Sequence, residues 1–257
     1  MSDQFSSVDA AIRAFREGKV VIVVDAEDRE NEGDFICAAE DATAEAINFM
    51  ITHGRGQVCM SVLPDVASRL ELPMMVESNQ TPLGTAFTIP VDHVSARTGI
   101  TAVERAKAVS AILSTESSPH DFVRPGHLFP LVAKEGGVLR RAGHTEATID
   151  LARISGKQPS GVLCEILDKD GNRADRNALQ ELAKQHGLEI ISIEELIRYR
   201  RTKEKLVERV AEAELPTKWG SFRVMAYNVR YESQQPIVFA MGDLETAEAP
   251  LVRIHSS

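Results

Sequence analysis

Three features are scarce or missing in this chain of 257 residues, and each absence excludes a class of protein. Cysteine occurs only at Cys37, Cys59 and Cys164, in apolar strand-like runs without zinc-ligand spacing, which predicts reduced thiols and no disulfide framework. No stretch approaches the roughly 20 apolar residues of a membrane span. The first ten residues lack the basic and apolar segments of a secretory signal. We therefore expect a cytoplasmic protein with no membrane partner.

An excess of positive charge is also missing. Lys and Arg number 29 against 38 Asp and Glu, which gives a net charge of -9 at pH 7. Nucleic-acid binding depends on clustered cations that contact phosphates, so this balance argues against nucleic acid as a partner. The hydrophobic content of 43% suffices for one sizeable core. A small-molecule ligand fits this composition better.

An acidic segment, residues 25–34, directly follows the apolar residues 20–24. Crowded carboxylates repel one another, so such a cluster is tolerated where a divalent cation or a cationic ligand offsets the repulsion. Mg²⁺ or Mn²⁺ suits it best, because hard cations prefer oxygen ligands and need only one or two carboxylates besides water and substrate oxygens. Arg29 is placed to hold an anion or a hydroxyl. A solvated acidic turn is the alternative, and other residues must decide.

A second cluster, residues 140–151, combines arginines, a glycine and a hydroxyl at the start of an expected helix. Free backbone N–H groups and the helix dipole favour an anion there, and Arg141 and Thr145 add donors. The segment predicts a phosphate cradle. His144 inside it is a candidate metal ligand beside a carboxylate. A lone histidine at a helix start is more often a cap or a surface residue, but the Arg-x-Gly-x-Thr context favours the functional interpretation.

Two further titratable residues adjoin apolar strands. His127 lies between a Pro-Gly turn and a strand, where partial burial would bring its pKa into the range that proton transfer near neutral pH requires. A structural histidine is the alternative. Glu165 interrupts an apolar run, and a carboxylate in a buried strand is costly unless it is paired or bound to a ligand. Both residues are candidates for acid-base chemistry.

Helical and strand patterns alternate through most of the chain. Helices are expected at residues 8–17, 43–54 and 101–113, and strands at 20–24, 35–39, 161–168 and 188–193. The order predicts an α+β domain over residues 1–205, with a mixed central sheet flanked by helices. Residues 199–208 are interpreted as the exposed end of a long helix. Residues 206–257 form a short β-rich segment, with strands expected at 222–227, 237–241 and 251–254.

Four strings, in order, make residues 5–202 resemble the 3,4-dihydroxy-2-butanone 4-phosphate synthases of riboflavin biosynthesis. They are DRENEGD from Asp28, RPGHLFP from Arg124, RAGHTEATID from Arg141 and GVLCE ending at Glu165. Members convert D-ribulose 5-phosphate into L-3,4-dihydroxy-2-butanone 4-phosphate and formate. The resemblance implies two Mg²⁺ or Mn²⁺ ions per site, metal-stabilised enediolate formation with skeletal rearrangement, and a homodimer with sites near the subunit interface.

The resemblance also implies a role for each matching residue. Glu30 and His144 would hold the metal, and His127 and Glu165 occupy the catalytic positions. The substrate would contact Arg29, Glu30, Asp34, Thr98, Arg141, Ala142, Gly143, His144, Thr145 and Glu165. Asp28 and Glu32 are expected to help close the site, and Cys59 to line it.

The tail resembles the opening of GTP cyclohydrolase II, in residues 213–223, 242–244 and 250–256. No cysteine follows Cys164, so the zinc ligands of that enzyme are missing and we expect no such activity. Two other functions compete with the synthase: a different metal-dependent phosphosugar enzyme, such as an isomerase or aldolase, and a non-catalytic sugar-phosphate-binding protein. The complete set of Glu30, His127, His144 and Glu165 favours the synthase.

Overall fold

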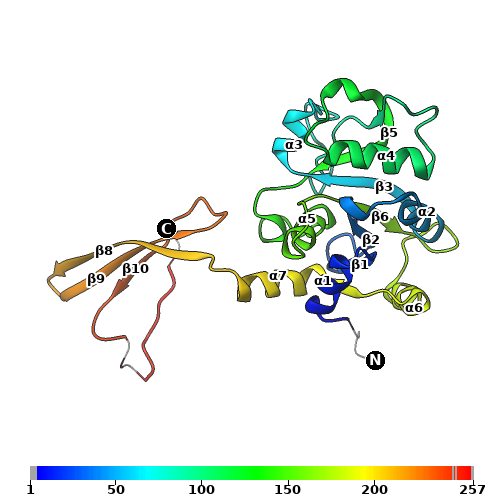
Figure 1. Cartoon of the computed structure of the whole chain (residues 1–257). Helices are drawn as coiled ribbons and strands as arrows, with labels where there is room; N and C mark the ends of the chain where they lie inside the picture. Colours follow the sequence, from blue (N-terminus) through cyan, green and yellow to red (C-terminus); the bar gives the residue numbers. More distant parts are fainter. Residues whose placement is uncertain (1–4, 245, 247, 256–257) are drawn as a thin grey trace. The chain divides into compact units, whose positions relative to one another are not determined.

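The computed structural model describes residues 5–244, 246 and 248–255 (Figure 1). The chain forms two compact units, one ending at Thr202 and the other beginning at Lys203, and each is described by itself. Residues 1–4, 256 and 257, at the ends of the two expected domains, lie outside the described residues, as do 245 and 247. Among the helices of the described residues, none has the length and apolar character to cross a bilayer.

The first unit is built on a seven-stranded mixed sheet, counted over the described residues, in the order β4-β5-β3-β6-β2-β1-β7. β1 is antiparallel to β2 and parallel to β7, whereas β3 is parallel to β5 and antiparallel to β6. The strands are β1 (Val21–Val24), β2 (Gly33–Ala38), β3 (Arg55–Val62), β4 (Val91–His93), β5 (Phe122–Val132), β6 (Gly161–Ile166) and β7 (Ile190–Ser192). The expected α+β class and mixed central sheet are confirmed.

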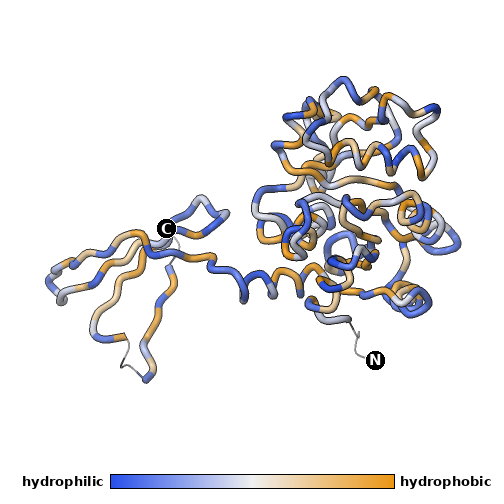
Figure 2. The backbone as a smooth tube through the Cα atoms, viewed as in Figure 1, coloured by the Kyte–Doolittle hydropathy of each residue, from blue (hydrophilic) through white to orange (hydrophobic). Residues whose placement is uncertain are grey.

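Helices cover both faces of this sheet, and two apolar clusters fill the space between (Figures 1 and 2). One face carries α2 (Ala44–His53), α3 (Pro64–Arg69), α4 (Ala102–Leu113) and α6 (Arg176–His186). The other carries α1 (Val8–Arg16), α5 (His144–Ile154) and the first residues of α7 (Ile193–Lys203). Successive strand residues point to opposite faces, so Phe35 and Cys37 join the first cluster while Ile36 and Ala38 join the second. Burial on both faces explains why β1 is apolar throughout and why Asp34 and Glu165 stand out as acidic residues in β2 and β6.

Polar side chains fix where several helices begin. Ser7, Thr43, Thr101 and Asp175 each accept a hydrogen bond from the backbone N–H three residues later, which satisfies a donor that the first turn leaves unpaired. Ser192 and Glu195 make the reciprocal bonds of a capping box, in which each side chain accepts the backbone N–H of the other residue. Three short 3-10 helices, Ala39–Asp41, Pro119–Asp121 and Gly137–Leu139, join the longer elements.

The second unit is a three-stranded antiparallel sheet, again over the described residues, in the order β10-β9-β8. Its strands are β8 (Val207–Thr217), β9 (Gly220–Val229) and β10 (Ile237–Ala240). The strands expected at 222–227 and 237–241 correspond to β9 and β10. The strand expected at 251–254 is wrong, because these residues have neither a regular structure nor a paired strand, and Leu251 and Ile254 are exposed.

The interpretation of residues 199–208 as an exposed helix end holds only for residues 201–203, the exposed last residues of α7. The helix α7 stops at Lys203, β8 begins at Val207, and Arg200 is buried against Asp150, 2.8 Å from its carboxylate. β8 is a largely exposed strand whose alternating charged and apolar residues pair with β9 along its length. Backbone pairing with β9, which the composition of the segment does not reveal, therefore determines that residues 207–217 form a strand.

Candidate active site

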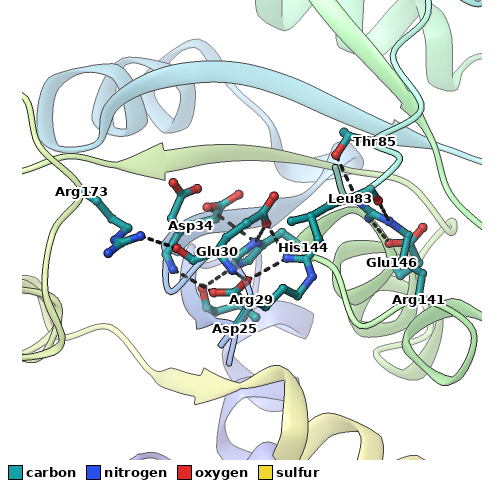
Figure 3. Close-up of polar contacts among 12 residues, drawn as sticks. Asp25, Arg29, Glu30, Asp34, Leu83, Thr85, Arg141, His144, Glu146 and Arg173 are labelled. Atoms are coloured by element: carbon teal, nitrogen blue, oxygen red, sulfur yellow. Dashed lines mark hydrogen bonds and ion pairs between the residues drawn. The ribbon is translucent and has the colours of Figure 1, made fainter. Parts of the chain in front are cut away.

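The acidic loop between β1 and β2 is folded around the carboxylate of Asp25, which is buried (Figure 3). Asp25 Oδ1 accepts the backbone N–H of Glu32 at 2.8 Å. Asp25 Oδ2 accepts the backbone N–H of Glu30 at 3.0 Å and Arg29 Nη1 at 2.8 Å. Charge-assisted bonds of this kind fix the loop, so it is an ordered part of the site and not merely a solvated turn.

Two arginines hold the same loop from its outer side. Arg173 Nη1 donates to the carbonyl of Glu30 at 2.6 Å, as Figure 3 shows, and Arg176 on α6 donates to the carbonyl of Asp25 at 3.2 Å. Gly33 leaves room for Leu179 where the loop enters β2, because a Cβ there would lie 2.6 Å from a methyl of that side chain. The backbone of Glu30 is thus held at its N–H by Asp25 and at its carbonyl by Arg173.

His144, the first residue of α5, faces this loop. Its Nε2 lies 3.1 Å from the carbonyl oxygen of Val23, which can only accept, so Nε2 carries the proton and Nδ1 presents a lone pair. Nδ1 lies 3.9 Å from both Glu30 Oε2 and Asp34 Oδ1. Burial lowers the pKa of His144, which favours the neutral imidazole that a metal ion requires.

Three carboxyl groups of the acidic loop and the neighbouring strands β2 and β6 have raised pKa values. Burial raises the pKa of Asp34 well above its usual range, and the charges of Glu165 and Glu32 add to the shift. Burial also raises the pKa of Glu165, opposed by the backbone N–H of Gln57 at 2.8 Å. Burial and the charge of Glu30 raise the pKa of Glu32. Within the described part of the chain, the positive charges near these three carboxyl groups do not offset the effect of burial and of the neighbouring negative charges.

The donor set fits a hard divalent cation. Ligand atoms of Asp25, Glu30 and His144 all lie within 4.8 Å of one another. Asp34 Oδ1, which faces His144, is buried and has no hydrogen-bond partner within the described part of the chain. Carboxylate oxygens with one imidazole suit Mg²⁺ or Mn²⁺. Asp25 was not among the predicted ligands, although it is the first acid after the apolar strand, and its oxygens already accept bonds from the loop.

The predicted phosphate cradle is the start of α5. Among the described residues, no side chain caps the helix at Gly143, so its first N–H groups are left for another acceptor. Gly143 leaves room for the guanidinium, because a Cβ there would lie 2.3 Å from Arg141 Nη1. Thr145 is buried in the first turn, and Ala142 is exposed just before it.

Arg141 is held by residues that the sequence alone did not single out. Its Nη1 donates to the buried Glu146 Oε2 at 2.7 Å, Nη2 to Thr85 Oγ1 at 3.0 Å and Nε to the carbonyl of Leu83 at 3.2 Å (Figure 3). A guanidinium has five N–H donors, so these contacts orient the group and leave donors for an anion. Glu146 follows Arg141 by five residues, and the start of α5 brings the two side chains into contact.

His127 lies on β5, and the expected Pro-Gly turn before it is an irregular stretch within the strand instead of a separate turn. Its Nδ1 lies 2.8 Å from Asp92 Oδ2, on β4. His127 and Glu165 share one face of the sheet, because Phe129 and Leu163, two residues from each, both belong to the apolar cluster under α5. β3 separates their strands, so their backbones are about 10 Å apart at the usual strand spacing.

The remaining predicted residues are distributed around this face. Thr98 donates its hydroxyl to Glu104 Oε2 at 2.9 Å, in the loop beside Asp92, and the described contacts do not bring it to Arg141. Cys59 is buried on β3, and burial with the charges of Glu165 and Asp34 raises the pKa of its thiol well above the usual range. Asp28 is exposed on the acidic loop.

Known proteins resemble the chain over both units. A family profile described as 3,4-dihydroxy-2-butanone 4-phosphate synthase matches residues 9–199, and one described as GTP cyclohydrolase II matches residues 208–257. The riboflavin biosynthesis protein RibBA of Bacillus subtilis is 50% identical over 253 residues, and that of Bacillus mycoides is 51% identical over 252. Each alignment covers 98% of this chain, which spans 64% of the length of either relative.

Two solved structures have the same fold. A crystal structure of RibBX, a two-domain 3,4-dihydroxy-2-butanone 4-phosphate synthase from A. baumannii, matches with a TM-score of 0.88 and 42% identity, over 94% of this chain and 72% of that one. A synthase in complex with two magnesium ions matches with a TM-score of 0.73 and 39% identity, over 77% of this chain and 98% of that one.

Proposed function

Because the chain belongs to the 3,4-dihydroxy-2-butanone 4-phosphate synthase family, we propose that it converts D-ribulose 5-phosphate into L-3,4-dihydroxy-2-butanone 4-phosphate and formate in riboflavin biosynthesis. The observation that carries the proposal is the position of His144. A buried neutral imidazole faces Glu30 and Asp34, at the start of a helix that begins without a side-chain cap among the described residues. A cation site thus adjoins an anion site, as a sugar phosphate with vicinal oxygens requires.

Glu30 and His144 would hold Mg²⁺ or Mn²⁺, and the unsatisfied oxygen of Asp34 adds a third donor. We propose two ions per site, in line with the magnesium complex of the related synthase. When bound, the ions supply positive charge that stabilises negative charge developing on the vicinal oxygens of the substrate.

The chain's own side chains would bind the substrate and move its protons. Arg141 and the first N–H groups of α5, with Thr145, would hold the phosphate. Glu165 retains its proton more readily than an ordinary glutamate, because burial raises its pKa, which suits a group that exchanges protons near neutral pH. His127 is the second proton carrier in this proposal. An isomerase on the same substrate would yield a five-carbon product and no formate.

We also propose a homodimer, with the site near the interface. Four exposed apolar side chains, Val94, Ile100, Val103 and Val123, lie on the segments that surround the contact between His127 and Asp92. β4 ends the sheet on this side. An apolar surface beside a polar pair is typical of a protein interface. The change of Val103 to Asp is expected to convert a dimer into monomers in sedimentation equilibrium.

Two further proposals concern the rest of the chain. These 257 residues contain no cysteine after Cys164 to bind zinc, and we propose that they do not by themselves release formate from GTP. Zinc-dependent release of formate from GTP would contradict this. The three cysteines of the chain are free thiols, which supports a cytoplasmic location.

The main test incubates the purified chain with D-ribulose 5-phosphate and Mg²⁺ and follows formate and the four-carbon product. Glu30→Ala, His144→Ala and an EDTA-treated sample are each expected to lose formate release. Glu181→Ala, an exposed change on α6, is the matched control and retains it. Absence of formate from the parent, with ribulose 5-phosphate bound, would shift the function to binding alone.

A further inference from the structure

The carboxylate of Asp92 makes two hydrogen bonds to a single residue. Asp92 Oδ1 accepts the backbone N–H of His127 at 2.9 Å, and Asp92 Oδ2 lies 2.8 Å from the Nδ1 of the same histidine. The Asp92 side chain is nearly buried, whereas that of His127 is 44% exposed. The carboxylate is therefore fixed in the protein, while the far side of the imidazole is accessible.

The strand register explains why this contact forms. Val91 pairs with Leu128, but the next residue, Asp92, pairs with Val123, so residues 124–127 of β5 bulge out of the ladder. The Asp92 side chain accepts the backbone N–H of His127 in place of a ladder partner. Gly126 allows the bulge to lie against β4, because a Cβ there would be 2.2 Å from the Asp92 nitrogen.

A second loop covers the carboxylate from outside. Gly99, with φ +85°, packs so closely that a Cβ would lie 1.9 Å from Asp92 Oδ2. Glu104 fixes this loop by accepting the backbone N–H groups of Arg97, Thr98 and Gly99, and the bonds from Arg97 and Thr98 lower its pKa to about 2. The loop keeps Asp92 in place and limits the access of water to it.

The chemistry of the pair fixes the proton on the imidazole. An ionised carboxylate only accepts, so the Nδ1 of His127 must carry a proton, and Nε2 is the atom that can take or give one. We propose that Asp92 is a positioning residue for His127, which holds the ring in the tautomer that directs Nε2 to the substrate. The kinetic consequence of this inference rests on the proposed synthase function, whereas the tautomer of His127 can be measured without it.

The first test is independent of activity. Heteronuclear NMR of ¹⁵N-labelled full-length protein, with His127 assigned from a His127→Gln sample, reports which ring nitrogen carries the proton when the ring is neutral. The expected result is a protonated Nδ1 and an unprotonated Nε2. An unprotonated Nδ1 in the parent protein would overturn the inference, whether or not the protein makes formate.

The second test uses Asp92→Asn, with Asp121→Asn, on the loop before β5, as the matched control. The Asn carbonyl can still accept the His127 backbone N–H, but its NH₂ group then faces Nδ1 and forces the proton to Nε2. We expect the reversed tautomer, a fall in kcat of at least about 100-fold, and a KM within about threefold of the parent. The control should retain parental kcat, KM and tautomer.

Two outcomes of this second test would overturn the positioning role. One is an unchanged tautomer in a folded Asp92→Asn protein. The other is a reversed tautomer with parental kcat while His127→Gln is inactive. If Asp92→Asn fails to fold, the parent's NMR result still decides the tautomer and, with it, the inference. If the parent releases no formate, the synthase proposal fails while the NMR measurement remains decisive for Asp92.

Discussion

The change of Arg200 to Met should destabilise the first unit far more than an arginine change two residues away. Arg200 Nη1 lies 2.8 Å from Asp150 Oδ2 and donates to the carbonyl of Gly136 at 2.7 Å, and both side chains of the pair are buried. Methionine preserves most of the side-chain volume but leaves the Asp150 carboxylate without its cation. Removal of one partner of a buried pair costs about 3–5 kcal/mol.

This loss corresponds to a fall in Tm of about 6–20 °C, at about 2–4 °C per kcal/mol for a unit of roughly this size. The measurement is scanning calorimetry of the full chain. Arg198→Met is the control, because Arg198 is on the same helix and pairs only at the surface with Glu194 in an i,i+4 arrangement. Such pairs contribute about 0.3–0.5 kcal/mol, so the control Tm should fall by no more than about 2 °C.

A similar small fall in both variants would refute the reasoning, because it would show that Arg200 does not neutralise Asp150 in the folded protein. The double change Arg200→Met with Asp150→Asn separates charge from packing. It removes the uncompensated carboxylate and should recover part of the lost Tm. The pair also holds the segment that leads to the cradle, since Gly136 and Val138 both bond to it.

Three further outcomes follow from the site. In EDTA, the free energy of unfolding of Asp34→Asn should exceed that of the parent at pH 8 by about 1–3 kcal/mol, the cost of an unsatisfied buried group. Because burial raises the pKa of Asp34, the parent loses this free energy only as the pH rises through that raised pKa. Denaturant titrations of the two proteins should therefore converge towards pH 4. A constant difference from pH 4 to 8 would exclude this cause. Gly143→Ala should displace Arg141 and raise the KM for D-ribulose 5-phosphate about tenfold in steady-state assays, which corresponds to the loss of one hydrogen bond to a charged group. An unchanged KM would mean that the cradle is elsewhere. Native Cys59 should resist alkylation at pH 8, as mass spectrometry would show, because its thiol is buried with a raised pKa; rapid labelling without unfolding would count against the described burial.

Local patterns were enough to predict much of the fold. The apolar residues 20–24 and 35–39, separated by acids, correspond to the antiparallel pair β1 and β2, because two buried strands joined by a short polar loop leave few alternatives. The mixed sheet and the helix starts at Thr43 and Thr101 follow from similarly local signals. In each case the residues that determine the element lie within it.

Contacts between distant segments were not predictable in the same way. The sequence predicts that Arg200 belongs to a charged, exposed helix end, and only the fold brings Asp150 to it across 50 residues of chain. Thr85 reaches Arg141 across 56 residues, and Asp92 reaches His127 across 35. The sequence identified candidate functional side chains through their chemistry, but the residues that orient them have ordinary local contexts.

Five acidic residues of the candidate site separate into two groups according to their partners. Asp25, Asp92 and Glu146 are buried, and each carboxylate accepts several bonds that orient Glu30, His127 or Arg141. Asp34 and Glu165 have too few donors, and burial raises their pKa values. A buried carboxylate without a cation or enough hydrogen-bond donors destabilises a fold. Such a group is expected where a bound cation and substrate complete its bonding. On this view the first group builds the site, and the second group is where ligands and protons are exchanged.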